Sequence, residues 1–177
     1  MTKEQVTSVQ KPFKEKYGLN PSTAQTRLSA RAVLGEDITC TNKIGNTNII
    51  TGMHPGVGGR SENICPATVF LDSLAACAGI VMGAVATHMG MEIRSGAVYV
   101  EGDLDLRGTL GIADDVQVGF KEIRMSVGID TDASKQEINT LLEMMEKYCV
   151  VYQTLAKPPK MHLELNNQKS GIDRQLG

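Results

Sequence analysis

Two cysteines on separate predicted helices are the residues best suited to chemistry in this chain. Cys77 lies within LDSLAACAGIVMG (71–83), the most apolar run, and Cys149 lies within EKYCVVYQTL (146–155). A peroxidatic pair uses one thiolate to attack an O–O bond, and a second thiol then resolves the sulfenic acid as a disulfide. A cysteine on an apolar helix face is also ordinary packing material. The residues alone leave both interpretations open.

Pairing of the two sulfurs depends on how their helices pack. If both helices lie over one sheet face the sulfurs can approach, and a disulfide then needs Cα atoms ~4.4–6.8 Å apart. Cys65 begins the first helix more than three turns before Cys77, so these two cannot pair, and Cys40 is expected to fill space on a strand. A zinc site built from Cys40, Cys65 and His54 or His88 lacks the usual close spacing of ligands.

Composition narrows the class of protein. The chain has 177 residues, 18 basic and 20 acidic, with a net charge of −2 and 41% hydrophobic residues. These values fit one globular domain and suggest neither a nucleic acid nor another charged polymer as partner. We expect a polar N-terminal arm (1–24), a single domain (25–166) and a polar C-terminal tail (167–177). The N-terminus lacks an apolar signal segment, which predicts a cytoplasmic protein.

The first long helix is predicted from Pro66 to Met89. Proline suits a first helical turn, and Gly90 suits the position after the last one. Apolar residues occur on every side of this helix, but Asp72 and His88 interrupt them, which favours a buried central helix over a membrane span. Asp72 would then need a partner, for which a basic residue of a second subunit is the expected source.

The remaining elements are predicted from turn signals and periodicity. Antiparallel strands are expected within 27–52, at the start of 98–111 and along 118–130, where alternate residues from Ile123 to Ile129 share one face. Ser134 and Glu137 form a capping box that opens a second helix running through 138–156. MHLEL (161–165) is expected to be a last short strand. This order predicts an α+β domain, with two helices on one face of an antiparallel sheet.

Two segments resemble a known family. PATVFLDSLAACAGIVMG and MMEKYCVVYQTL are similar to the two cysteine motifs of the OsmC/Ohr family, the osmotically inducible and organic hydroperoxide resistance proteins. The glycine-rich HPGVGG and the closing MHLEL fit as well, so the resemblance covers about residues 27–165. It implies the OsmC-like fold, an antiparallel β-sheet with two main helices packed on one face, in an intertwined homodimer.

The resemblance also implies an activity. Members of the family reduce organic hydroperoxides, so Cys77 would be the peroxidatic cysteine and Cys149 the resolving cysteine of an organic hydroperoxide reductase. Electrons would come from a dithiol such as a reduced lipoyl group. No metal, flavin or haem is implied, and no membrane or nucleic acid is expected as a partner.

One departure from the family concerns thiol activation. The family's peroxidases carry a glutamate about three helical turns before the first cysteine, paired with an arginine, and here that place holds Ala67 and Thr68. A thiol in apolar surroundings keeps its proton, and Cys77 is too far into its own helix for the N-terminal dipole to help. The charged residues that could replace the missing carboxylate are Arg27, Arg31, Arg60 with Glu62, and Arg107 with Asp105.

Three functions remain open at this level. The first is a cysteine-based thiol peroxidase, and the second is another thiol–disulfide activity on the same scaffold, which the missing glutamate favours. The third is a non-enzymatic dimer that binds a small hydrophobic ligand between its subunits. The third predicts that Cys77→Ser preserves function and that Cys149 is unreactive.

Overall fold

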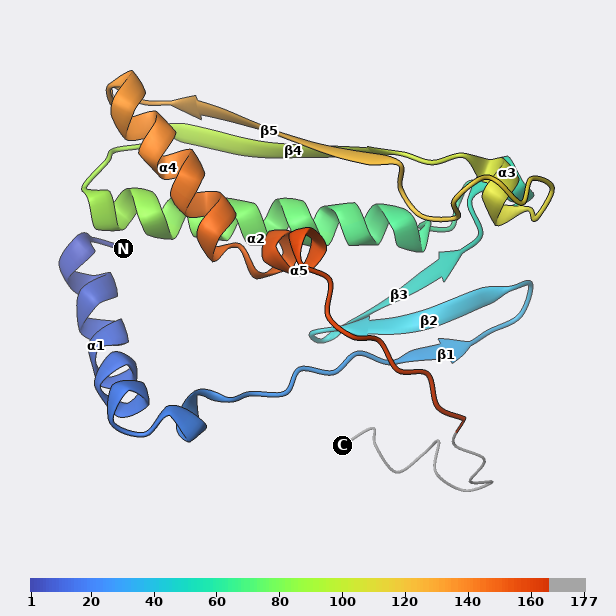
Figure 1. Cartoon of the computed structure of the whole chain (residues 1–177), viewed down its shortest axis with the longest axis horizontal. Helices are drawn as coiled ribbons and strands as arrows, with labels where there is room; N and C mark the ends of the chain where they lie inside the picture. The colour runs from blue at the N-terminus through green and yellow to red at the C-terminus, as the bar shows by residue number, and fades with distance from the viewer. Residues whose placement is uncertain (166–177) are drawn as a thin grey trace.

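A long central helix organises the chain. The structure is a computed structural model that describes residues 1–165, and its longest helix, α2 (Pro66–Met89), runs through the middle (Figure 1). The N-cap of α2 is Cys65, and Gly90 closes the helix in the left-handed conformation with φ 71°. Both predicted ends are therefore confirmed, since proline needs no hydrogen bond at the start and glycine tolerates a positive φ at the end.

A two-stranded hairpin covers one side of α2. Strand β4 (Ser95–Asp103) pairs antiparallel with β5 (Glu122–Asp130) along their full lengths. Alternate β5 residues from Ile123 to Ile129 pack against the core, as their period of two predicts. The hairpin lies along α2 and α4 crosses that helix, so the main helices and the hairpin share one core (Figure 1).

A second sheet stands beside the first turns of α2. Strands β1 (Ala32–Leu34), β2 (Thr39–Ile44) and β3 (Thr47–Gly52) form an antiparallel meander in that order. The short helix η2 (Pro55–Val57) follows it, and α3 (Leu106–Thr109) lies against η2. The α+β class with antiparallel strands is confirmed, and the described strands are divided between two sheets.

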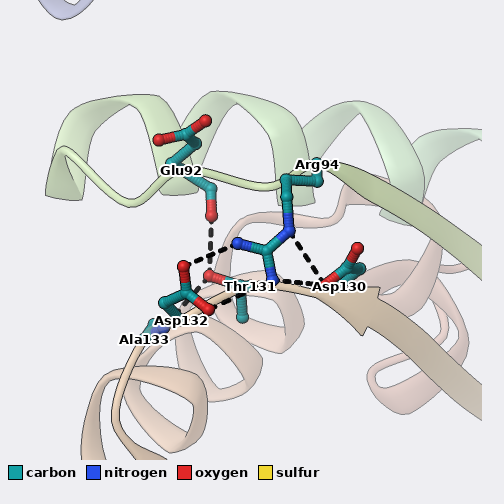
Figure 2. Close-up of polar contacts among 6 residues, drawn as sticks. All are labelled: Glu92, Arg94, Asp130, Thr131, Asp132 and Ala133. Atoms are coloured by element: carbon teal, nitrogen blue, oxygen red, sulfur yellow. Dashed lines mark hydrogen bonds and ion pairs between the residues drawn. The ribbon is translucent and has the colours of Figure 1, made fainter.

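Ion pairs fasten the end of the hairpin next to α4. Arg94, at the start of β4, donates from Nε to Asp130 at 3.0 Å and from Nη1 to Asp132 at 2.6 Å (Figure 2). The Thr131 hydroxyl donates to the carbonyl of Glu92 at 2.6 Å. Hydrogen bonds to Asp130 and Asp132 raise the pKa of Arg94. Because these side chains are exposed, the ion pairs of Arg94 add little to the free energy of unfolding. Their main effect is to fix the path of the chain between β5 and α4.

The second predicted helix is interrupted at the cysteine. The capping box of Ser134 and Glu137 opens α4 (Lys135–Tyr148) as expected. The single helix expected over 138–156 is wrong, because Cys149 is extended (φ −74°, ψ 108°) and α5 (Val150–Ala156) starts after it. The N–H of Cys149 still donates to the carbonyl of Met145, so the break lies on the far side of the cysteine. Cys149 thereby ends one helix and begins the next.

The two ends of the domain differ from the sequence prediction. The N-terminal arm contains helix α1 (Lys3–Leu19), followed by η1 (Pro21–Ala24), where no periodicity had indicated a helix. A capping box between Thr2 and Gln5 starts α1, and no residue of α1 is buried. Residues 161–165 are not a strand, because no strand edge of the described chain pairs with them. The predicted tail (167–177) lies outside the described residues.

The core of the single chain is small and covers one face of α2. Its buried apolar residues are Leu74, Ala78, Met82, Ala86, Leu141, Met145 and Cys149. The expectation of a helix buried on all sides is wrong for the single chain, since Ile80 is 74% exposed. Asp72 is exposed as well, so it needs no partner within the chain. Helix α2 as a whole is long and apolar enough to span a membrane by length and composition alone.

Candidate active site

The fold brings the two helix cysteines together. Cys77 lies in the middle of α2, and Cys149 lies at the break between α4 and α5, where α4 crosses α2 and α5 contacts it. The two sulfurs lie close enough for each thiol to change the pKa of the other. Leu74, Ala78, Leu141 and Met145 pack around this crossing and hold both cysteine backbones in place. Tertiary packing thus creates a dithiol site from distant segments.

The break at Cys149 also supplies donors to Cys77. Burial by itself would raise the pKa of the Cys77 thiol, but hydrogen bonds from the backbone of Val151, from the Cys149 side chain and from the backbone of Val150 outweigh it, and the pKa is lowered. The backbone groups belong to the first turn of α5, where N–H groups have no partner within the helix. They favour the thiolate of Cys77 over its thiol.

The pKa of Cys149 changes in the opposite direction. Burial raises it most, and the neighbouring Cys77 raises it further, against backbone hydrogen bonds from Tyr152 and Val151. Cys149 is fully buried, whereas Cys77 is half-buried. The site therefore holds one accessible sulfur that favours the thiolate and one enclosed sulfur that keeps its proton. This asymmetry suits a nucleophile and a second thiol that acts after it.

The cations proposed from the sequence lie elsewhere. Arg60 donates to Asp37 at 2.8 Å and lies 4.0 Å from Glu62, all exposed. Arg107 lies in α3 and donates to Asp105, the N-cap of that helix, at 2.6 Å.

Arg60 and Arg107 are therefore both paired with carboxylates and neither interacts with Cys77. Hydrogen bonds from Arg107 and Lys121 lower the pKa of Asp105 far below its usual range. No cation is among the groups that lower the pKa of Cys77 within the described chain. Sequence reasoning missed the groups that do, the backbone amides of Val150 and Val151, because backbone donors leave no motif.

Arg31 is the predicted cation with the most unusual environment. Its Nη1 is buried and has no hydrogen-bond partner among residues 1–165. A buried donor without an acceptor costs free energy, so a group outside the described chain is the expected partner. The structure does not place Arg27 or Arg31 among the groups that act on Cys77.

Hollows in the surface offer room for a substrate near the cysteines. One of about 380 Å³ lies between α2, β5 and the last two helices, α4 and α5, and is lined by Leu74, Tyr152 and Leu155, without either cysteine. A larger cavity, at the first turn of α2, includes neither Cys77 nor Cys149 in its lining. Among the described residues, no three His, Cys, Asp or Glu side chains are grouped closely enough to hold a metal ion.

Comparisons with known proteins agree with this architecture. The family model described as OsmC-like protein matches residues 59–164. An OsmC-like protein from Mycoplasma pneumoniae superposes with a TM-score of 0.65 at 22% identity, covering 76% of this chain and 90% of that one. No curated protein matches the sequence.

Two further structures carry names that mention peroxide resistance. An organic hydroperoxide resistance protein from Elizabethkingia anophelis has a TM-score of 0.61 at 14% identity, covering 76% of this chain and 92% of that one. One from Legionella pneumophila has a TM-score of 0.59 at 17% identity, covering 75% and 93%. Identities this low establish a shared fold.

Proposed function

Since this chain belongs to the family of OsmC-like proteins, we propose that it is a thiol peroxidase that reduces organic hydroperoxides, with Cys77 as nucleophile and Cys149 as resolving cysteine. The observation that carries the proposal is the meeting of the two sulfurs where α4 and α5 contact α2, at which α5 backbone groups and the Cys149 thiol lower the pKa of Cys77. The names of two structural neighbours support the same chemistry.

The proposed reaction has three balanced steps. The Cys77 thiolate attacks the terminal peroxide oxygen, the S–O bond forms, the O–O bond breaks, and the alkoxide leaves as an alcohol after taking a proton. Cys149 then gives up its proton and attacks the Cys77 sulfenic acid, which forms the disulfide and releases water. A dithiol reductant, of the lipoyl kind, returns both sulfurs to the reduced state with two electrons. A cytoplasmic location, where thiols stay reduced, fits this cycle.

Direct thiol mapping tests the proposal. The reduced protein is mixed with one equivalent of cumene hydroperoxide, quenched after seconds and mapped by mass spectrometry. We expect a single new disulfide between Cys77 and Cys149, with Cys40 and Cys65 still free. Four free thiols after many minutes would exclude the peroxidase and leave the hydrophobic ligand-binding alternative.

Backbone donors are expected to control the reactivity of Cys77. Val150→Pro removes one N–H from the thiolate, and proline is tolerated there because Val150 is the first residue of α5 and Cys149 before it is extended. We expect the pKa of Cys77 to rise, so that alkylation by iodoacetamide reaches half its maximal rate at a higher pH.

The matched control keeps the N–H. Val150→Ala truncates a side chain that is 70% exposed, so it is expected to leave the midpoint of Cys77 unchanged. An equal midpoint in the proline and alanine variants would show that the amides do not activate the thiol.

We propose a homodimer as the functional form. The uncovered apolar face of α2 includes Ile80, and Leu163 and Leu165 project from an unpaired segment at 101% and 90% exposure. The buried Nη1 of Arg31 also lacks an acceptor in the described chain. A second copy would cover these apolar groups and offer edges for the segment 161–165.

Sedimentation tests the dimer. We expect a single species of about twice the chain mass at micromolar concentration. Leu163→Asp is expected to shift that species toward the monomer by placing a charge in the interface, whereas Lys160→Asp changes charge on the same segment outside its apolar positions. A wild-type monomer at tens of micromolar would contradict the arrangement.

A further inference from the structure

A cavity of about 600 Å³ lies where α1 meets the uncovered face of α2. Helix α1 stands at the end of α2 that carries His88, and the extended segment 25–31 joins it to the rest of the chain (Figure 1). The apolar part of the lining consists of Ile80, Val81, Ala84, Val85, Met89 and Met144. Helix α1 lies outside the residues that the family model matches (59–164), so the family resemblance does not account for this cavity.

The α1 side of the cavity carries a positive charge without a counter-charge. Gln10 and Lys14 line it from α1, and His88 lines it from α2. Nε2 of His88 lies 3.2 Å from Oε1 of Gln10, which links the two helices. Lys11 pairs with Glu15 at 3.9 Å, whereas Lys14 makes no ion pair with any residue of the described chain. The lining residues include no Asp or Glu, so the cavity is complementary to a negatively charged group.

The exposed stripe of α2 carries such a group. Its members recur every three or four residues along one side of the helix and are Asp72, Ser73, Ala76, Ile80 and Gly83. Asp72 is the only acidic residue in the sequence of α2, and it makes no ion pair within residues 1–165. Ile80 is 74% exposed, so covering it is favourable. The other members are small, which allows a second helix to approach closely.

Two-fold symmetry would bring this stripe to the cavity. Most homodimers are two-fold symmetric, so the same surface of each copy meets its counterpart. When the axis crosses α2 at Ile80, the two helices run antiparallel. Asp72 precedes Ile80 by eight residues and His88 follows it by eight, ~12 Å along the helix in each direction. Asp72 of one copy therefore reaches His88 and Lys14 of the other, whereas a parallel pairing would place Asp72 beside its own copy, where like charges repel.

We propose that the cavity between α1, α2 and α4 receives the start of α2 from a second copy of this chain, with Asp72 of the partner subunit paired with Lys14 beside His88. The inference rests on the homodimer proposed above and adds a function for α1, which holds the partner's helix from outside the matched domain.

Zero-length cross-linking tests the contact directly. A carbodiimide joins an amine to a carboxylate where the two groups form an ion pair, and mass spectrometry maps the products. We expect a covalent dimer in which Lys14 is joined to Asp72. Within one chain this link is out of reach, because α2 rises ~24 Å from Asp72 to His88, the end of the helix where α1 packs. The intrachain link between Lys11 and Glu15 is the internal control, and its formation without the Lys14–Asp72 link would overturn the proposal.

Exchanging the charges tests whether the pair stabilises the dimer. Lys14→Glu and Asp72→Lys are each expected to weaken the dimer about tenfold or more, because a two-fold dimer contains the pair twice and an exposed pair contributes about threefold. Both substitutions in one chain restore opposite charges, so the dissociation constant should return to within about threefold of the wild type. Lys16→Glu makes the same change on α1 outside the cavity lining and is the matched control. Additive losses in the double variant, or an equal loss from Lys16→Glu, would contradict the pairing.

Sedimentation over a dilution series separates this inference from the homodimer and from the peroxidase. A wild-type dimer that the double variant does not recover would overturn the contact and leave the homodimer standing. A wild-type monomer at tens of micromolar would overturn both. Failure of the thiol chemistry would leave the contact untouched, since neither Cys77 nor Cys149 lines the cavity. Circular dichroism of each variant confirms that the chain is folded.

Discussion

Replacing Cys77 by serine is expected to abolish the reduction of cumene hydroperoxide, with a loss of ~10³-fold or more, because an alcohol of high pKa replaces the thiolate nucleophile. The measurement is the steady-state consumption of peroxide with dihydrolipoate as reductant. The α5 amides still face position 77 in this variant, so they remain but have no thiolate to stabilise. Activity within about twofold of the wild type would exclude Cys77 as the nucleophile.

Cys149→Ser separates attack from resolution. This variant should consume about one equivalent of peroxide per chain and then stop or slow, since attack precedes the step that needs Cys149. Dimedone should trap the sulfenic acid on Cys77 in this variant and little of it in the wild type. Cys40→Ser and Cys65→Ser are the matched controls, because these cysteines lie on β2 and at the start of α2 and are expected to leave turnover unchanged.

Leu141→Ala is expected to destabilise the domain by ~2–5 kcal/mol, the range for large-to-small changes in a packed core. Leu141 is fully buried at the α2–α4 crossing, where Leu74, Met145 and Cys149 also pack. The cavity left behind cannot collapse easily, because α2 is also held by strand β4. The measurement is the denaturant midpoint of the reduced protein at one fixed concentration, with the slope of the transition compared between variants.

The neighbouring leucine provides the control. Leu142→Ala removes the same atoms from a side chain that is 37% exposed, so a loss clearly smaller than that of Leu141 is expected. Equal losses at the two positions would mean that a second copy covers Leu142 or that the core lies elsewhere. The same Leu141 variant should also slow formation of the Cys77–Cys149 disulfide, because the crossing positions both sulfurs.

Local signals in the sequence determined most of the elements. Pro66 and Gly90 mark the ends of α2, the capping box marks the start of α4, and the alternation from Ile123 to Ile129 marks the buried face of β5. These signals are readable because they depend on neighbours only a few residues apart. The two cysteine motifs also indicated the family, which the match to residues 59–164 confirms.

Longer-range features were decided only by the tertiary structure. The sequence predicted a continuous helix through Cys149, but the helix breaks at that residue. The break brings the first turn of α5 to the Cys77 sulfur on α2, although the two segments are far apart in the sequence. The exposed face of α2 and the unpaired 161–165 depend on what else is present to cover them. Periodicity reports which residues are apolar, but burial and pKa depend on which surfaces meet. The sequence by itself thus identified the two cysteines. The packing of the helices lowers the pKa of Cys77 and raises that of Cys149.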